Sequence, residues 1–185
     1  MNAVSRQRLL ELFRERAFSF GKFTLASGKE SSYYVNSKKA LFHSEAAGLL
    51  GEAMYDLTCD LDIQAVGGLE VGAIPLATAC VIHYHQQGRT MEGFFVRKQT
   101  KGHGSQERIE GVLPPGARVA ILDDVLTTGG SALQAVQAVE QAGATVAAVV
   151  CIVDRLEGAR ELFATRYEYR PLFTIRDFGV EPPVG

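Results

Sequence analysis

Residues 119–136, VAILDDVLTTGGSALQAV, change character twice along their length. They begin as an apolar run typical of a buried strand, which ends in the adjacent acids Asp123 and Asp124. A segment rich in threonine and glycine follows, and an apolar pattern with helical spacing begins at Ser131. In an open parallel sheet, ligands bind beyond the carboxyl ends of the strands. This stretch therefore predicts a strand, a turn and a helix that hold a polar ligand at the edge of such a sheet.

The turn itself has the chemistry of a phosphate site. The first turn of a helix exposes unpaired N–H groups and the positive end of the helix dipole. Thr127, Thr128 and Ser131 add hydroxyl donors, and Gly129 and Gly130 let the backbone approach an anion closely. Neither GxxxxGK[ST] nor GxGxxG is present. The preceding acids would repel a phosphate, so we expect them to face a ribose diol with bound Mg²⁺. The alternative is a water-facing acid pair followed by a turn with Ser131 as N-cap.

Composition restricts the class of protein. The chain has 185 residues, 46% hydrophobic and 22% charged, which predicts one folded domain spanning residues 1–185. A formal charge of −2 gives no chain-wide reason to bind nucleic acid or an anionic membrane. The N-terminus is unlike a signal peptide and no apolar run reaches membrane-spanning length, so we expect a cytoplasmic protein that acts on small molecules. Cys59, Cys80 and Cys151 are far apart, which predicts reduced core residues.

The pattern along the chain predicts an α/β fold. Strands rich in Val and Ile alternate with helices, which indicates a mostly parallel central sheet flanked by helices. Residues 1–40 are expected to form a small α+β hood. The expected helices span 5–16, 43–57, 75–87 and 131–143, the expected strands span 63–69, 92–98, 117–124 and 145–154, and a hairpin is expected at 23–36.

Several positions refine these elements. Leu9, Leu12, Phe13 and Phe20 are expected to face the core, with Gly21 ending that region.

Other residues mark helix boundaries. Pro75 suits the first turn of a helix, and Gly88 and Gly143 suit the left-handed position that follows a helix.

A second glycine-rich turn, GGLEVGAIP, follows the strand expected at 63–69. Two phosphate-compatible loops in one sheet indicate a ligand with separated anionic groups. The alternative for its glycines is tight packing between strand and helix, which is plausible for Gly72 alone.

A long polar connection, KQTKGHGSQERIEGVLPPG, lies between two expected strands. An irregular loop of this length in a compact domain is usually functional or disordered. Arg97, Lys98, Lys101, His103 and Arg108 make it cationic, so it can close over an anionic substrate and stabilise a leaving group. The alternative is a solvated charged loop.

Together these segments resemble the type I phosphoribosyltransferases, and among them most closely the orotate phosphoribosyltransferases. The resemblance covers nearly the whole chain and rests, beyond the motif at 119–131, on residues 20–36, 67–77, 97–111 and 153–161. It implies the fold of that family and a Mg²⁺-dependent transfer of the phosphoribosyl group from 5-phosphoribosyl-1-diphosphate to orotate. The products would be orotidine 5′-monophosphate and diphosphate, in pyrimidine biosynthesis. It also implies a homodimer whose active sites are shared across the interface.

The resemblance further implies roles for individual residues. Asp123 and Asp124 would engage the ribose hydroxyls and Mg²⁺, and residues 97–111 would form a flexible catalytic loop. The implied catalytic residues are Lys101, Asp124, Arg97 and His103. The implied substrate ligands are Lys29, Tyr33, Tyr34, Gly67, Gly68, Leu69, Glu70, Lys98, Asp123, Val125, Leu126, Thr127, Thr128, Gly129, Gly130, Ser131 and Arg155.

Alternatives remain for the residues expected at the orotate ring. Tyr33 and Tyr34 also fit plain strand packing, which must hold for at least one of two alternating faces. Arg155 also fits a salt bridge with Glu157 or Glu161.

The chain also departs from some family members, which have lysines where it has Ala26 and Val71. Lys29 and Lys22 are candidates to replace those charges.

Three rival functions stay open. The same fold can act on a purine or another pyrimidine, although Arg155 and the SSYYVN segment favour an acidic pyrimidine. A regulator can bind phosphoribosyl diphosphate without turning it over, although a sensor does not need Lys101 and His103. A purely structural domain leaves both phosphate-compatible loops unexplained.

Overall fold

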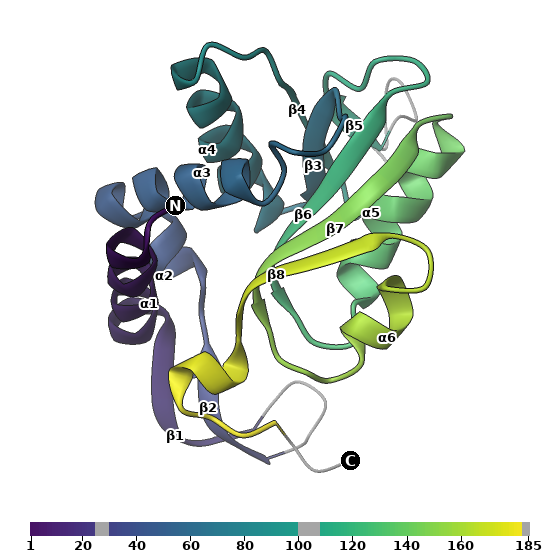
Figure 1. Cartoon of the computed structure of the whole chain (residues 1–185). Helices are drawn as coiled ribbons and strands as arrows, with labels where there is room; N and C mark the ends of the chain where they lie inside the picture. Colours follow the sequence, from purple (N-terminus) through teal and green to yellow (C-terminus); the bar gives the residue numbers. More distant parts are fainter. Residues whose placement is uncertain (25–29, 100–107, 183–185) are drawn as a thin grey trace.

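The centre of the structure is a six-stranded sheet (Figure 1). The computed structural model describes residues 1–24, 30–99 and 108–182. The strand order is β5-β4-β3-β6-β7-β8, in which neighbours run parallel except that β5 is antiparallel to β4. The strands are β3 (Ala65–Leu69), β4 (Glu92–Val96), β5 (Ile109–Gly111), β6 (Arg118–Leu126), β7 (Thr145–Asp154) and β8 (Glu168–Thr174).

Helices cover both faces of this sheet and bury two apolar layers. One layer packs under α1, α3 and α4, and the other under α5 and α6, as Figure 1 shows. The predicted mostly parallel sheet flanked by helices is therefore confirmed. The helices are α1 (Ala3–Ala17), α2 (Lys38–Leu41), α3 (Ser44–Asp56), α4 (Ala73–Gln86), α5 (Gly130–Gln141) and α6 (Ala159–Phe163).

Strand β6 divides its side chains between the two layers. Ala120 and Leu122 are buried in the layer of α1, α3 and α4, whereas Ile121 is buried in the layer of α5. Successive side chains of a strand point to opposite faces of the sheet. The alternation therefore sends Asp123 toward the α5 layer and Asp124 toward the α4 layer.

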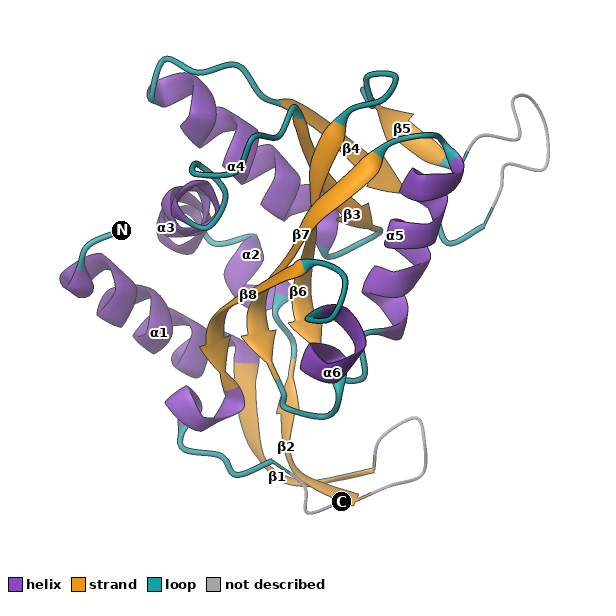
Figure 2. Cartoon of the chain, turned by 45° about the vertical axis from the view of Figure 1, so that its right-hand side comes forward, coloured by secondary structure: helices purple, strands orange, loops and turns teal. Residues whose placement is uncertain are grey.

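A small antiparallel sheet of β1 (Phe18–Thr24) and β2 (Glu30–Val35) forms the hood. It lies beyond the ends toward which the arrows of β6, β7 and β8 point (Figure 2). The short 3-10 helix η1 (Ile175–Phe178) packs against it, with the rings of Phe18 and Phe178 stacked 4.3 Å apart. The predicted hairpin is confirmed, and it faces the carboxyl edge of the main sheet.

The expectation that Phe20 lies in the core is wrong. Helix α1 ends at Ala17, and β1 continues through Gly21, so that glycine does not end the region. Phe18 takes the buried position beside η1, while Phe20 lies farther along the hairpin and is 57% exposed. Leu9, Leu12 and Phe13 are buried as predicted.

The main helix and strand boundaries lie close to the predicted ones. Strand β7 has the predicted bounds, and β6 extends past Asp124 to Leu126. Gly88 and Gly143 both follow helices with positive φ, at 70° and 83°. The sequence did not predict α2, β5, α6, β8 or η1. Each is short or, in the case of β8, irregular in its apolar pattern.

The cysteine prediction is confirmed only in part. Cys80 and Cys151 are free and buried, but the free Cys59 is partly exposed beyond the end of α3.

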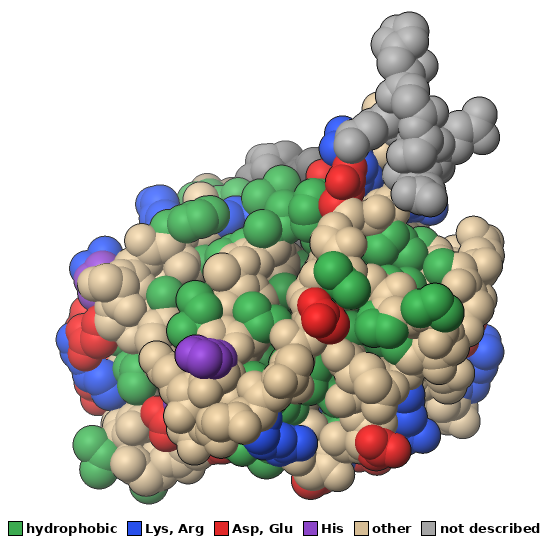
Figure 3. Space-filling view, turned by 90° about the horizontal axis from the view of Figure 1, so that it is seen from above, with side chains coloured by type: hydrophobic (Ala, Val, Ile, Leu, Met, Phe, Trp, Pro, Cys, Tyr) green, Lys and Arg blue, Asp and Glu red, His purple; other side chains and the backbone are tan. Residues whose placement is uncertain are grey.

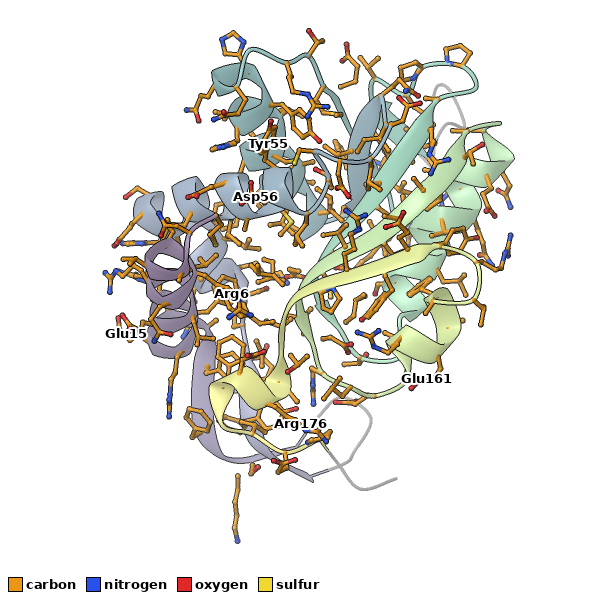
Figure 4. All side chains as sticks on the ribbon, in the orientation of Figure 1. Arg6, Glu15, Tyr55, Asp56, Glu161 and Arg176 are labelled. Carbon is orange, nitrogen blue, oxygen red and sulfur yellow. The ribbon has the colours of Figure 1, made fainter. Side chains whose placement is uncertain are left out.

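Two labelled side chains in Figure 4 show how the helical layer of α1 and α3 is held. The Arg6 guanidinium of α1 donates to the carbonyl of Leu172, 2.9 Å away, and lies 4.6 Å from the ring centroid of Phe173. Tyr55 of α3 packs edge-on against Tyr84 of α4, with ring centroids 4.8 Å apart. These contacts fix α1 to the end of β8 and α3 to α4.

Two glycines provide a matched test of packing between the strands. A Cβ atom on Gly68 of β3 would lie 2.0 Å from the carbonyl oxygen of Leu122, whereas one on Gly48 of α3 would meet no atom within 4 Å. We expect Gly68→Ala to lower the free energy of unfolding by about 1–3 kcal/mol. We expect Gly48→Ala to raise it by about 0.5–1 kcal/mol, because alanine favours the helix interior. Urea denaturation measures both, and equal effects would contradict this packing.

Candidate active site

The candidate site lies where the carboxyl edge of the main sheet faces the hood. The ends of β3, β4, β6 and β7 meet there, and Figure 2 shows the β1–β2 hairpin beyond them. Segments far apart in the sequence thereby contribute side chains to one region. This is the edge at which open parallel sheets bind ligands.

Asp124 is the most highly connected acid in the site. Its Oδ2 accepts hydrogen bonds from the Ser37 hydroxyl and from the Lys38 ammonium, the latter at 3.0 Å. Its Oδ1 accepts from the backbone N–H of Val125 at 3.0 Å. A Cβ atom on Gly72 would lie 2.5 Å from its Cγ atom. The carboxylate therefore joins β6, the start of α2 and the turn before α4.

Asp123 points to the other face of the sheet and has fewer partners. Its Oδ1 accepts from the backbone N–H of Asp124 at 2.8 Å. Its Oδ2 is buried and has no hydrogen-bond partner among the described residues. An unpaired buried polar oxygen is rare and indicates a position for a binding partner, such as a ligand hydroxyl, a water or a metal ion.

The pKa values of the two acids are shifted in opposite directions. Burial raises the pKa of Asp123 well above its usual range, and the charge of Asp124 adds to this shift. Burial also disfavours ionised Asp124, but the hydrogen bonds from Ser37 and Lys38 outweigh burial and lower its pKa. The negative charge of the pair is therefore concentrated on Asp124.

The donor chemistry of this pair fits Mg²⁺, which prefers carboxylate oxygens and retains waters or substrate oxygens as further ligands. In the described part of the chain, no cluster of three or more His, Cys, Asp or Glu side chains could hold a metal ion. A Mg²⁺ ion at Asp123 and Asp124 would therefore need ligands from substrate or water.

The predicted phosphate cradle corresponds to the turn between β6 and α5. Gly129 is the N-cap of α5 with φ 87°, and a Cβ atom on it would lie 2.6 Å from the Phe163 ring. The alternative with Ser131 as N-cap is therefore wrong, and Ser131 lies in the first turn of the helix. The turn is anchored by the N–H of Ala159, which donates to the carbonyl of Thr127 at 3.2 Å.

The remaining predicted ligands on this segment differ in accessibility. Thr128, Gly130 and Ser131 are exposed at the start of α5, where helix N–H groups have no intrahelical partner. Thr127 and Val125 are half-buried, and Leu126 is buried at the end of β6. The exposed positions can thus meet an anion directly, whereas Leu126 fixes the end of the strand.

The glycines of the second loop are tightly packed against their neighbours. Gly67 and Gly68 are buried inside β3, and a Cβ atom on Gly67 would lie 2.4 Å from the carbonyl oxygen of Phe94. Strand packing therefore requires these two glycines. Gly72, for which packing was the plausible alternative, makes room for the Asp124 carboxylate.

The end of β3 is also tied to the end of β4. The Glu70 carboxylate accepts from the backbone N–H of Lys98 at 2.8 Å, and the Glu70 N–H donates to the carbonyl of Val96 at 2.8 Å. Leu69 is buried, and the Glu70–Val71 peptide bond is cis. Glu70 thus holds two loops together, while the exposed side chain of Val71 leaves the turn without a cation.

The structure shows the two ends of the predicted catalytic loop. The Arg108 guanidinium donates to the carbonyl of Arg97 at 3.1 and 3.2 Å, and the Arg97 guanidinium lies 3.5 Å from Glu110. Strand β5 occupies part of the segment expected to be irregular. The predicted ligands Lys101, His103 and Lys29 lie outside the described residues.

Arg155 and Tyr33 lie together on the hood side of the site. The Arg155 Nε donates to the Tyr33 hydroxyl at 3.0 Å, and the guanidinium carbon is 4.9 Å from the ring centroid. The Arg155 Nε also lies 2.8 Å from a Glu157 carboxylate oxygen, so the expected salt bridge forms with Glu157. Tyr34 is 48% exposed and packs beside Phe23, because neighbouring residues of β2 point to opposite faces.

Sequence reasoning missed three residues that shape the site. Ser37 and Lys38 contact Asp124 from α2, an element too short for a periodic signal. Asp154 is fully buried, and its Oδ1 accepts from the N–H of Leu156 at 2.8 Å. Leu156 has a positive φ of 58°, so Asp154 fixes the turn that presents Arg155. The sequence signal that could have found Asp154 is its place next to Arg155 at the end of a buried strand.

A hollow of about 650 Å³ lies elsewhere, at the amino ends of β6 and β7. Its arginines include Arg166, which lies 3.5 Å from Glu140, and Arg170, which lies 2.6 Å from Asp60. Its guanidinium groups are thus partly neutralised, and none of the predicted site residues lines it.

The charge pattern of the visible surface agrees with a small-molecule protein. On the face shown in Figure 3, outside the grey residues, positive and negative side chains are interspersed among apolar and uncharged ones. None of the helices in the described ranges combines the length and the apolar character needed to cross a membrane.

Comparison with known proteins identifies the family. Residues 43–182 match the family model described as a phosphoribosyl transferase domain. The chain belongs to the phosphoribosyltransferase family. The family resemblance inferred from the sequence is thereby confirmed.

The relatives most similar in sequence and structure include several orotate phosphoribosyltransferases. The orotate phosphoribosyltransferase of Corynebacterium glutamicum is 42% identical over 181 residues, which cover 97% of each chain. That of Streptomyces avermitilis is 47% identical over 156 residues, covering 84% of this chain and 86% of its own. The Mycobacterium tuberculosis orotate phosphoribosyltransferase, crystallised with 5-phospho-α-D-ribosyl 1-diphosphate, has a TM-score of 0.81 at 40% identity. That alignment covers 95% of this chain and 99% of the other.

The cradle offers a test of its own geometry. We expect Gly129→Ala to lower the free energy of unfolding by about 1 kcal/mol or more, because a side chain there meets both a left-handed backbone and the Phe163 ring. Gly130 has open space around its Cβ position, so Gly130→Ala should change stability much less. Thermal and urea unfolding of both variants measure this difference, and a greater loss for Gly130→Ala would contradict the assigned cradle.

Proposed function

We propose that this protein transfers the phosphoribosyl group from 5-phosphoribosyl-1-diphosphate to orotate, giving orotidine 5′-monophosphate and diphosphate in pyrimidine biosynthesis. The observation that carries the proposal is the position of Asp123 and Asp124 between the α5 cradle and the turn at Gly72. A ribose diol flanked by a phosphate and a diphosphate matches that order. Orotate is supported by the curated relatives, which are orotate phosphoribosyltransferases. We further propose that residues 1–185 act as one domain in the cytoplasm.

The acids would hold the ribose and stabilise its charge. Ionised Asp124 can accept from the ribose hydroxyls and face the positive charge that develops on the sugar as its bond to diphosphate breaks. The unpaired Oδ2 of Asp123 provides a further acceptor for a ligand hydroxyl. Mg²⁺, bound at these carboxylates and at substrate oxygens, would neutralise the departing diphosphate. This reaction does not require a covalent nucleophile.

The cradle would hold the 5′-phosphate at the other end of the ribose. Thr128, Gly130 and Ser131 are exposed at the N-terminus of α5, where N–H groups and the helix dipole favour an anion. The anchored turn at Thr127 keeps these groups in place before substrate arrives. Such preorganisation stabilises charge without reorganising the site.

Arg155 and Tyr33 would recognise orotate. Orotate is a flat anion, so a guanidinium suits its carboxylate and an aromatic ring suits its face. In the structure Arg155 is shared between the Tyr33 hydroxyl and Glu157, which holds the guanidinium in place. An acidic pyrimidine therefore fits this region better than an uncharged base.

The catalytic loop and a homodimer belong to the same proposal. Lys101 and His103, which the family resemblance assigns to the loop, would reach the diphosphate of a neighbouring subunit. The tied ends of the loop at Arg97 and Arg108 give it fixed attachment points. A shared site requires that the active species sediments as a dimer.

The test mixes the protein with orotate, phosphoribosyl diphosphate and Mg²⁺ and follows the loss of orotate absorbance. We expect absorbance to fall, and to do so only with Mg²⁺. Binding of phosphoribosyl diphosphate without turnover would instead indicate a regulator. Turnover of adenine or another base, with none of orotate, would identify a different base.

The acid pair gives a matched prediction. Asp124→Asn removes the charge that faces the ribose, so we expect the KM for phosphoribosyl diphosphate to rise by about tenfold or more. Asp123→Asn should have a smaller effect, because Asp123 faces the α5 layer and, unlike Asp124, contacts neither Ser37 nor Lys38. Initial-rate kinetics compare the variants, and circular dichroism checks their fold. A greater loss for Asp123→Asn would contradict the assigned charges.

Arg155 gives a separate prediction about the base. We expect Arg155→Ala to raise the KM for orotate by about tenfold or more, since a hydrogen bond to a charged group contributes about 1.5–3 kcal/mol. The KM for phosphoribosyl diphosphate should change little. Arg160→Ala is the control, because Arg160 lies on α6, where its guanidinium packs over the ring of Tyr169 from β8. Equal losses for both substrates in Arg155→Ala would indicate general damage instead.

A further inference from the structure

Lys38 places a positive charge in the site that no sequence motif indicated. Its ammonium lies 3.0 Å from Asp124 Oδ2. Its side chain is 48% exposed, whereas that of Asp124 is 11% exposed. Among the lysine and arginine side chains that the structure describes, it is the one with a contact to the acid pair. It therefore combines a direct hold on Asp124 with access to solvent.

The hydrogen bonds of Asp124 leave little room for a ribose diol. Oδ1 accepts from the Val125 N–H, and Oδ2 accepts from both Ser37 and Lys38. A carboxylate has about four acceptor positions, so two ribose hydroxyls would exceed them. Val125 N–H belongs to β6 and Ser37 is only 2% exposed. The flexible, half-exposed side chain of Lys38 is the donor that can leave.

The turn before α4 lies beside Asp124 and has no positively charged side chain of its own. Gly72 packs against the same carboxylate that Lys38 contacts. Val71 is 53% exposed in this turn, and the Glu70 carboxylate is engaged by the Lys98 N–H. A diphosphate at the start of α4 would thus lie beside an apolar side chain and an acid.

We propose that Lys38 is a ligand of the diphosphate group of phosphoribosyl diphosphate. Its ammonium neutralises Asp124 in the structure, and when the ribose hydroxyls bind Asp124 it turns to the diphosphate. One positive charge thereby serves both states of the site. This inference rests on the proposed function, because it needs a substrate with both a ribose diol and a diphosphate.

The test uses Lys38→Gln, whose amide can still donate to Asp124 but carries no charge. Lys39→Gln is the matched control, because Lys39 is exposed on the same helix and, in the described part of the chain, contacts neither acid. Calorimetry measures the binding of phosphoribosyl diphosphate with Mg²⁺, and separately of ribose 5-phosphate, which has the diol but no diphosphate. We expect Lys38→Gln to weaken the binding of phosphoribosyl diphosphate by about tenfold and to leave ribose 5-phosphate binding unchanged or tighter. Lys39→Gln should match the wild type, and Lys38→Arg should retain most affinity for phosphoribosyl diphosphate.

Two results would overturn the inference. Unchanged affinity for phosphoribosyl diphosphate in folded Lys38→Gln would remove Lys38 from the diphosphate site. Equal loss of both ligands would show that Lys38 only holds Asp124. If Lys38→Gln does not fold, Lys38→Met, which also removes the charge, decides by the same two criteria. Failure of the proposed function is separate, because the wild type itself would then not consume orotate.

Discussion

The structure of the site depends on one buried negative charge. The Asp124 carboxylate lies at the end of β6, where it accepts from Ser37, Lys38 and the backbone of Val125. Taking a carboxylate out of water is costly unless hydrogen bonds and an opposite charge compensate for it. Ser37 and Lys38 lie at the start of α2, which directly follows the hood. The same charge that prepares the site for a ribose therefore also joins the hood to the main sheet.

The alternation of β6 explains why two adjacent acids behave differently. Asp124 faces the hood and is surrounded by donors, whereas Asp123 faces the α5 layer and keeps an unpaired oxygen. The first remains ionised, and burial favours the neutral form of the second. The charge of Asp124 can stabilise an electron-poor sugar, and Mg²⁺ at the pair would offset the repulsion between the acids and the anionic ends of the substrate. The asymmetry thus follows from strand geometry and suits the proposed transfer.

Local sequence patterns were sufficient to predict those parts of the site whose residues are contiguous in the sequence. The acids, the cradle and the helix after it are contiguous, so the strand, turn and helix could be predicted together. The turn before α4 was found as well, but the role of its glycines was not. Whether a glycine faces a neighbouring strand, as Gly68 does, or a carboxylate, as Gly72 does, depends on residues far away in the sequence.

Contacts between distant segments could not be predicted in this way. Ser37 and Lys38 meet Asp124 only because the hood folds over the sheet edge, and α2 is too short to have a periodic pattern. The pair Tyr33 and Tyr34 shows a related limit. Alternation requires that they face opposite sides, but only the packing of the hood decides that Tyr33 meets Arg155.

The most direct measurement of this account is a double-mutant cycle between the hood-side donor and the acid. The free energies of unfolding of the wild type, Ser37→Ala, Asp124→Ala and the double variant would be compared by urea denaturation. Because both side chains are buried and the acceptor is charged, we predict a coupling energy of about 1.5–3 kcal/mol. Additive effects, within about 0.5 kcal/mol, would show that Asp124 does not join the hood to the sheet and would contradict the account.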